Sequence, residues 1–203
     1  MALRTLILLG LALVACRQPS ESRAEREPPP VEKDFTLLLE MARLLPLSNE
    51  HARLYSEAWM EILRAAPNEE IRAEARYNLG CAGLRAKRPE VARKWFEEAV
   101  ASEFACADRG RSGYHLGMMQ YTGKEYEAAR RNLAIYLDSD PDNLDWMAAA
   151  ELRRAECLLE LGRPEEGRAE LERFIASRAV PDGHSAASVN AARRRLTALD
   201  KDS

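Results

Sequence analysis

The feature that most constrains this fold is a pattern of small and large residues that recurs every 37 or 38 residues along the chain. The units begin at Thr36, Ala73, Gly110 and Ala148. In the clearest unit the patterned residues are Leu79, Gly80, Ala92, Phe96 and Ala99. Small residues allow two helix backbones to approach closely, and the larger residues fill the space beside them. A recurrence of this length predicts an array of antiparallel helix pairs.

The segment from Ala73 to Val100 closely resembles a tetratricopeptide repeat, because its Leu-Gly pair, its alanines and its Phe occupy the hallmark positions of that family. The resemblance covers nearly all of residues 36–176. It implies an all-α fold, a right-handed superhelical solenoid of about four helix pairs across residues 34–199, with residues 200–203 as a tail. The segment from Ser185 to Leu199 places Val189, Ala192 and Leu196 on one face, which predicts a last helix that caps the solenoid.

The repeats exceed the 34 residues typical of the family by three or four residues, which is about one helical turn. Asn68 and Asn143 precede this added length and are good N-cap residues. We therefore expect the first helix of a pair to be extended by one turn at its N-terminal end. In the first unit Arg43 stands where the family has a small residue, so we expect that helix pair to splay.

Near the start of the chain, one basic residue, Arg4, precedes an apolar run from Leu6 to Ala15. This run is too short to span a bilayer, and the pattern fits a secretory signal peptide over residues 1–15. The end of this run, Leu13-Val14-Ala15-Cys16, resembles the lipobox of bacterial lipoproteins. The resemblance implies that Cys16 is acylated and becomes the new N-terminus. Because Arg17 replaces the aspartate associated with inner-membrane retention, it also implies the periplasmic face of the outer membrane. An ordinary signal peptide and a secreted, unlipidated protein are the alternative.

Residues 16–33 contain three consecutive prolines and almost no large apolar side chains, so they are expected to form a disordered tether. The other cysteines are Cys81, Cys106 and Cys157. Their wide spacing favours small buried apolar residues over metal ligands, with one disulfide as the alternative.

In the tetratricopeptide family, five positions of each first helix line a concave groove that binds protein partners. Carried over to this chain, the groove residues that we select are Tyr77, Leu84, Arg85, Arg111, Tyr114, Met118, Tyr121, Leu152 and Glu156. The middle of this groove is rich in Tyr and Met, which suits peptide binding. The alternative is that Tyr77 and Tyr121 only cover neighbouring helices.

Two further patterns concern the same helices. The carboxylate clamp of the co-chaperone subgroup is absent, since Glu40 and His115 replace residues it needs, and Asn78 is better interpreted as a structural residue. Gly110, Gly113 and Gly117 form one stripe, which indicates close backbone packing or, as the alternative, a helix that orders on binding.

The sequence contains no phosphate-binding loop, no nucleophile elbow and no histidine at metal-ligand spacing, so we expect no enzyme, metal, cofactor or small-molecule substrate. The formal net charge of −3 and the lack of a basic stripe argue against nucleic acid. Similar lipoproteins assist envelope assembly, including β-barrel insertion and pilus secretin assembly. We therefore expect a scaffold that binds envelope proteins, with an adaptor or regulator of a cell-wall enzyme as the alternative.

Overall fold

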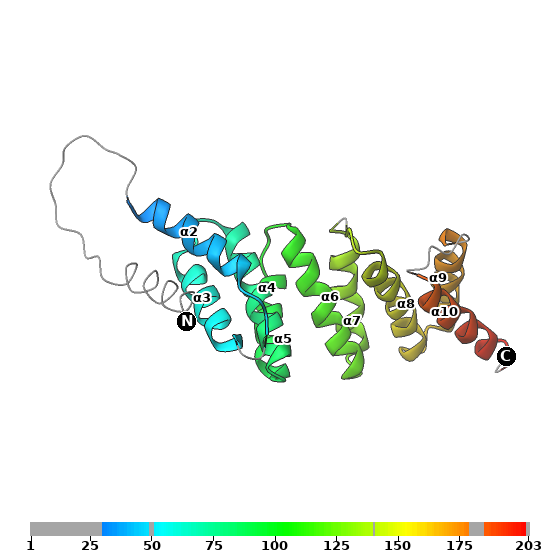
Figure 1. Cartoon of the computed structure of the whole chain (residues 1–203). Helices are drawn as coiled ribbons and strands as arrows, with labels where there is room; N and C mark the ends of the chain where they lie inside the picture. The colour runs from blue at the N-terminus through cyan, green and yellow to red at the C-terminus, as the bar shows by residue number, and fades with distance from the viewer. Residues whose placement is uncertain (1–29, 49–50, 140, 179–184, 202–203) are drawn as a thin grey trace. The chain divides into compact units, whose positions relative to one another are not determined.

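Figure 1 shows a computed structural model of the chain, which describes residues 30–48, 51–139, 141–178 and 185–201. Within these ranges the backbone forms α-helices joined by turns and loops, and no strand is present. The all-α helical-repeat fold class is confirmed. The predicted signal peptide, Cys16 and most of the predicted tether lie outside the described residues. The chain divides within α5 (Pro89–Val100) into two compact units, residues 1–92 and 93–203, which are described separately.

The first unit contains α2 (Pro30–Leu44), α3 (Ala52–Ala65), α4 (Glu69–Arg85) and the start of α5. Helix α3 packs against both α2 and α4. The largest side chain of its core is Trp59, which is fully buried together with Ile62 on the same helix. Helix α2 begins four residues before the expected start of the helical array, at Pro30, whose fixed φ suits the first turn of a helix.

The divergent first pair does form, with α2 against α3. Arg43 lies at the surface, where its Nε and Nη2 donate hydrogen bonds of 2.7 and 2.6 Å to the two carboxylate oxygens of Glu74 on α4. The long side chain at this small-residue position therefore reaches α4 instead of being inserted between the helices of its own pair.

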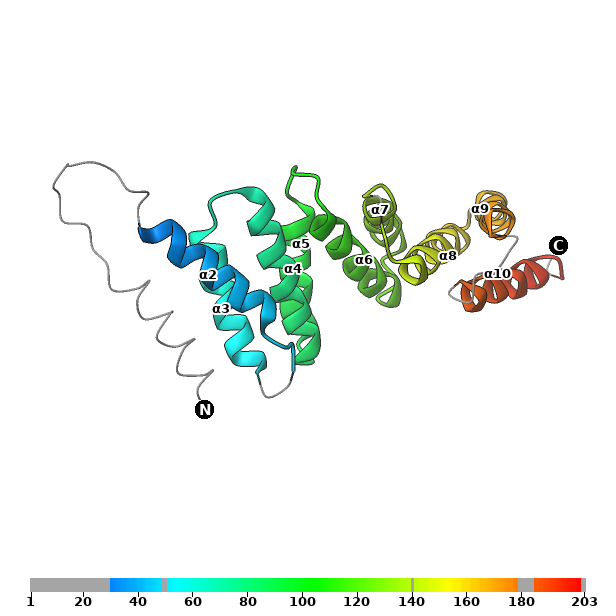
Figure 2. The ribbon, with the colours of Figure 1, turned by 45° about the horizontal axis from the view of Figure 1, so that its top comes forward.

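The second unit contains the rest of α5, then α6 (Ala107–Thr122), α7 (Tyr126–Leu137), α8 (Leu144–Glu160), α9 (Pro164–Ser177) and α10 (Ala186–Leu199). From α6 to α10 each helix packs against the next, and α10 also contacts α8 (Figure 2). No helix in the described ranges is both long enough and apolar enough to cross a bilayer.

The extra turn predicted at the start of the first helices is confirmed. Helix α4 begins four residues before the repeat frame, and Asn68 Oδ1 accepts a hydrogen bond of 3.0 Å from the backbone N–H of Ile71. Helix α8 begins in the same way, with Asn143 Oδ1 accepting from the backbone N–H of Trp146 at 2.9 Å. Each side chain satisfies a backbone donor that the helix leaves without an internal partner.

The glycine stripe of α6 lies against α7. A Cβ atom on Gly113 would lie 2.8 Å from the carbonyl oxygen of Asn132, and one on Gly117 would lie 2.7 Å from Leu133 Cγ. Contacts this short leave no room for a side chain, so close backbone packing, the first of the two interpretations, is supported.

The predicted capping helix is also confirmed. Val189 and Ala192 of α10 are buried in one cluster with residues of the last helix pair, namely Ala148, Leu152, Ala155, Leu171 and Phe174. On the other side of α10, Arg193 and Arg194 are exposed, as expected for the solvated face of a cap.

Candidate functional site

An aromatic cluster in the second unit surrounds Tyr114, one of the predicted groove residues. The Tyr114 ring stacks on the indole of Trp146 with centroids 4.6 Å apart and planes 4° apart. His115 contacts the same indole edge-on at 4.9 Å and stacks on Phe96 at 5.1 Å. Tyr136 approaches Tyr114 at 5.2 Å. Tyr114 is thus half-buried and held in place by three helices, α6, α7 and α8.

Burial in this cluster lowers the pKa of His115 to about 4, so its imidazole is neutral near neutral pH. The same burial raises the pKa of Tyr114, and it raises that of Tyr136 to about 12. The titratable side chains of the cluster, Tyr114, His115 and Tyr136, are therefore all uncharged at neutral pH.

Tyr121 lies on α6 two turns beyond Tyr114 and is connected to α8. Its hydroxyl donates a hydrogen bond of 2.9 Å to Glu156 Oε2. The guanidinium carbon of Arg153 lies 4.9 Å from the Tyr121 ring centroid, and Arg153 also donates to Glu156. Burial and the Glu156 carboxylate raise the pKa of Tyr121 to about 12. This hydrogen bond joins two predicted groove residues from different repeats, Tyr121 of the third and Glu156 of the fourth.

Sequence reasoning missed Trp146 and Arg153. Trp146 lies in the added turn of α8, before Ala148, where the repeat pattern and its groove positions begin. Arg153 follows Leu152, but it occupies a position that the groove pattern leaves out. The extra helical turn itself was the signal that could have indicated Trp146, since it adds a full turn of side chains to the start of α8.

Leu152 is a correction to the predicted groove. Its side chain is 4% exposed and packs in the cluster with Phe174 and Val189. The reason is that α10 covers this face of α8. On the same face Glu160 accepts a hydrogen bond of 2.7 Å from Arg195 of α10. In the fourth repeat the position at Leu152 therefore belongs to the core.

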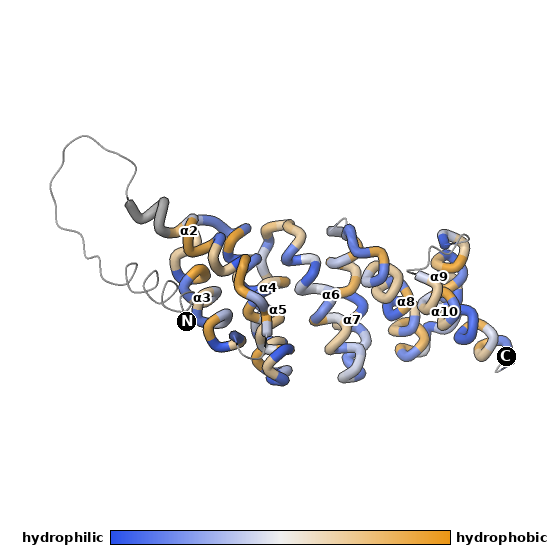
Figure 3. Tube along the Cα trace, viewed as in Figure 1, coloured by the Kyte–Doolittle hydropathy of each residue, from blue (hydrophilic) through white to orange (hydrophobic). Residues whose placement is uncertain are grey.

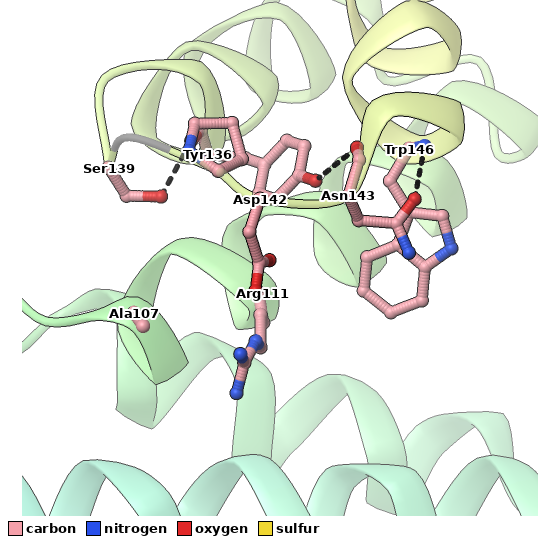
Figure 4. Close-up of a pocket in the computed structure, with 8 residues that line it drawn as sticks. Ala107, Arg111, Tyr136, Ser139, Asp142, Asn143 and Trp146 are labelled. Atoms are coloured by element: carbon pink, nitrogen blue, oxygen red, sulfur yellow. Dashed lines mark hydrogen bonds between the residues drawn. The ribbon is translucent and has the colours of Figure 1, made fainter. Parts of the chain in front are cut away.

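The remaining predicted residues of the second unit are placed as follows. Met118 is partly buried against the cluster of Leu133, Tyr136 and Ala150. Arg111 donates a hydrogen bond of 3.2 Å to Asp108 Oδ1, and it lines a pocket of about 380 Å³ (Figure 4). The other residues around this pocket are Ala107, Tyr136, Ser139, Pro141, Asp142, Asn143 and Trp146.

The pocket is bounded by hydrogen-bonded groups as well as by rings. Ser139 Oγ donates to the carbonyl oxygen of Tyr136 at 2.7 Å, and the Tyr136 hydroxyl donates to the carbonyl oxygen of Asn143 at 3.4 Å (Figure 4). A site of this size, with one cation, one carboxylate and aromatic walls, can receive a single side chain of a partner protein.

In the first unit, the predicted residues lie along α4. Tyr77 is half-buried, Leu84 is 36% exposed, and Arg85 is exposed at the end of the helix. Asn78 accepts a hydrogen bond of 2.5 Å from the Tyr55 hydroxyl, and its amide donates to the carbonyl oxygen of Glu74 at 2.8 Å. The first bond ties α3 to α4 and the second lies within α4, which agrees with the structural role expected for Asn78.

No disulfide joins Cys81, Cys106 and Cys157, and Cys157 is fully buried. Burial raises the pKa of the Cys157 thiol to about 12. Across the described ranges, no cluster of three or more His, Cys, Asp or Glu side chains is placed to hold a metal ion.

Residues 149–178 match the tetratricopeptide repeat family. The match covers most of α8 and all of α9, which form the fourth helix pair, although the pattern in the sequence is clearest in the second. No curated protein matches the chain, and no solved structure does. Repeats of this type bind protein partners and typically act as non-catalytic scaffolds. Residues 149–178 are therefore a repeat of the tetratricopeptide type, and a repeat of this type suggests a scaffold for protein–protein interaction.

Proposed function

We propose that this chain is a lipid-anchored scaffold of the bacterial envelope. In this proposal Cys16 holds it at the periplasmic face of the outer membrane, and the surface formed by α6 and α8 binds a protein partner during assembly of an envelope complex. The observation that carries the binding part is the joined pair of Tyr121 and Glu156, with Arg153 against the tyrosine ring.

The geometry of this pair suits recognition of a protein segment. Tyr121 and Arg153 are partly exposed, yet each is held by the other and by Glu156, so little side-chain freedom remains to be lost on binding. Tyr and Arg are the residue types that most often contribute binding energy at interfaces. The Arg153 and Glu156 charges balance, which favours a segment of mixed polar and apolar character over a strongly charged one.

The anchor is supported by the sequence. The apolar run up to Ala15, followed by Cys16, fits the lipobox pattern. One acyl chain gives only marginal membrane binding, whereas two or more hold a soluble domain firmly. A polar stretch rich in Pro, Glu and Arg then separates Cys16 from the first described helix.

The binding surface can be tested by photo-crosslinking in the native envelope. A photoreactive amino acid placed at Met118 or Tyr121 should crosslink one specific protein, which mass spectrometry then identifies. The matched control is the same group at Arg131, an exposed position on α7. If the Arg131 position captures the same protein with equal yield, the α6–α8 surface is not the binding site.

The anchor requires a separate test. Growth with an alkyne fatty acid should label the wild-type chain, and Cys16→Ala should abolish the label. Globomycin, which blocks the lipoprotein signal peptidase, should make the precursor accumulate. Labelling that persists in Cys16→Ala would show that Cys16 is not the acylated residue.

A further inference from the structure

Helix α2 carries two leucines on the side that faces away from the core. Leu44 is 83% exposed and Leu37 is 56% exposed. They are seven residues apart, which is about two helical turns, so they lie on the same face. The inward face holds Leu38, Leu39 and Ala42, all of which are buried. Figure 3 shows that apolar residues continue along much of α2.

This outer face differs from that of the last helix. In α10 the buried side holds Val189 and Ala192, while Arg193 and Arg194 face solvent. Helical repeats need a polar outer face on their terminal helices to remain soluble. The first described helix lacks that polar face at Leu37 and Leu44, and an exposed apolar patch of this kind usually marks a contact surface.

The position of α2 in the chain indicates what it contacts. Only 13 residues lie between Cys16 and Pro30. Fully extended, this stretch reaches at most about 50 Å. If Cys16 is held in the bilayer, α2 is the first described helix to follow the anchor and lies within that distance of the lipid surface.

The size of the patch argues against a second copy of the chain as its partner. A stable interface between proteins buries about 800 Å² on each side, far more than two leucine side chains can supply. A bilayer contact does not need that area, because the anchor already keeps the local concentration of lipid high. Of the exposed charged residues beside the leucines, Arg43 is paired with Glu74 and Glu40 is acidic, so the contact does not depend on anionic lipid.

We propose that Leu37 and Leu44 insert at the surface of the membrane to which the chain is anchored. This inference rests on the lipid anchor of the proposed function. The acyl chains hold the protein to the bilayer, and α2 then forms a second, reversible contact that fixes how the first unit is oriented on it.

The experiment attaches the purified chain to vesicles without using Cys16. A hexahistidine tag replaces residues 1–16 and binds a nickel-chelating lipid in vesicles of phosphatidylcholine and phosphatidylethanolamine. In a background with Cys81→Ser and Cys106→Ser, a fluorophore is placed at Leu44→Cys. The matched control carries it at Lys94→Cys, an exposed position on α5. Quenching by spin-labelled lipid then reports contact with the bilayer.

We expect quenching at position 44 to exceed that at position 94 by about threefold or more, because only an inserted side chain comes within reach of the acyl region. Adding Leu37→Ser should reduce this quenching while the circular dichroism spectrum stays unchanged. Equal quenching at the two positions would overturn the proposal. Self-quenching or crosslinking between position 44 of two copies would overturn it in favour of a dimer. Since attachment is through the tag, neither result depends on whether Cys16 is acylated in the cell.

Discussion

The ring of Tyr114 lies flat against the indole of Trp146, with the two centroids 4.6 Å apart. Tyr114 belongs to the first helix of the third repeat, and Trp146 to the turn added at the start of the fourth. The contact therefore joins two consecutive repeats through a residue that the ordinary repeat length would not provide. The two residues belong to α6 and α8, the helices whose surface is proposed to bind a partner, and Trp146 also lines the pocket beside Arg111.

Replacing Trp146 by alanine should destabilise the second unit by about 2 kcal/mol, because it removes a half-buried aromatic side chain together with its stacking on Tyr114. Urea unfolding followed by circular dichroism measures this change. Leu144→Ala is the matched control, since Leu144 is an exposed apolar residue in the same helical turn. Equal losses for the two variants would mean that the stack contributes no stability of its own.

Gly113→Ala should also destabilise the second unit, by about 1–3 kcal/mol, although alanine is the better helix former. The new Cβ atom would lie 2.8 Å from a backbone oxygen of α7, which cannot move without shifting the helix. Gly123→Ala serves as the control, because its nearest neighbour is the end of the flexible Glu125 side chain at 3.3 Å. A stable Gly113→Ala variant would favour the interpretation of α6 as a helix that orders on binding.

His115 should make the protein less stable in mild acid. Its folded-state pKa of about 4 lies below the ordinary value of 6.5, so between these two pH values the unfolded chain binds the proton more tightly. Its contribution is fully present above pH 6.5 and falls by about 2–3 kcal/mol as the pH drops to 4. Urea midpoints measured across this range should decline less in His115→Phe, which keeps a ring against Phe96. An unchanged decline in that variant would assign the effect to other groups.

Tyr121 should have the opposite pH dependence. Its folded-state pKa of about 12 lies above the ordinary value of 10, so the folded protein holds the phenolic proton more tightly. The stability that this provides is complete below pH 10 and is lost as the pH rises towards 12. Tyr121→Phe should therefore flatten the alkaline decline in the urea midpoint, and ultraviolet titration of tyrosinate should show one fewer late-ionising tyrosine. A normal titration of Tyr121 would mean that its bond to Glu156 does not persist in solution.

Most of the fold could be predicted because it depends on local rules that the sequence contains directly. The two asparagine caps predict the longer first helices. Ala92 and Phe96 are fully buried, as their positions in the repeat require. The candidate site was harder to predict because it depends on neighbours from other helices. Leu152 has the sequence position of a groove residue, yet α10 covers it, and no pattern within α8 itself reports that α10 lies there.

Trp146 and Arg153 show a second limit of sequence reasoning. The groove positions of the family are defined for a repeat of 34 residues. Trp146 lies in the turn added before the first of these positions, so the family pattern does not include it. Arg153 contributes through contacts with Tyr121 and Glu156, and these arise only when α6 and α8 are side by side. Both residues become evident only from the packing of one repeat on the next.

Helix α10 has one more consequence. It occupies the face of α8 on which the first helix of a fifth repeat would stack, and Val189, Ala192 and the Arg195–Glu160 pair hold it there. It therefore acts as a terminator that limits the length of the array. A partner segment bound along α6 and α8 therefore leaves this surface where α10 covers α8. The last helix of the chain thus limits how many residues of the partner can contact the repeats.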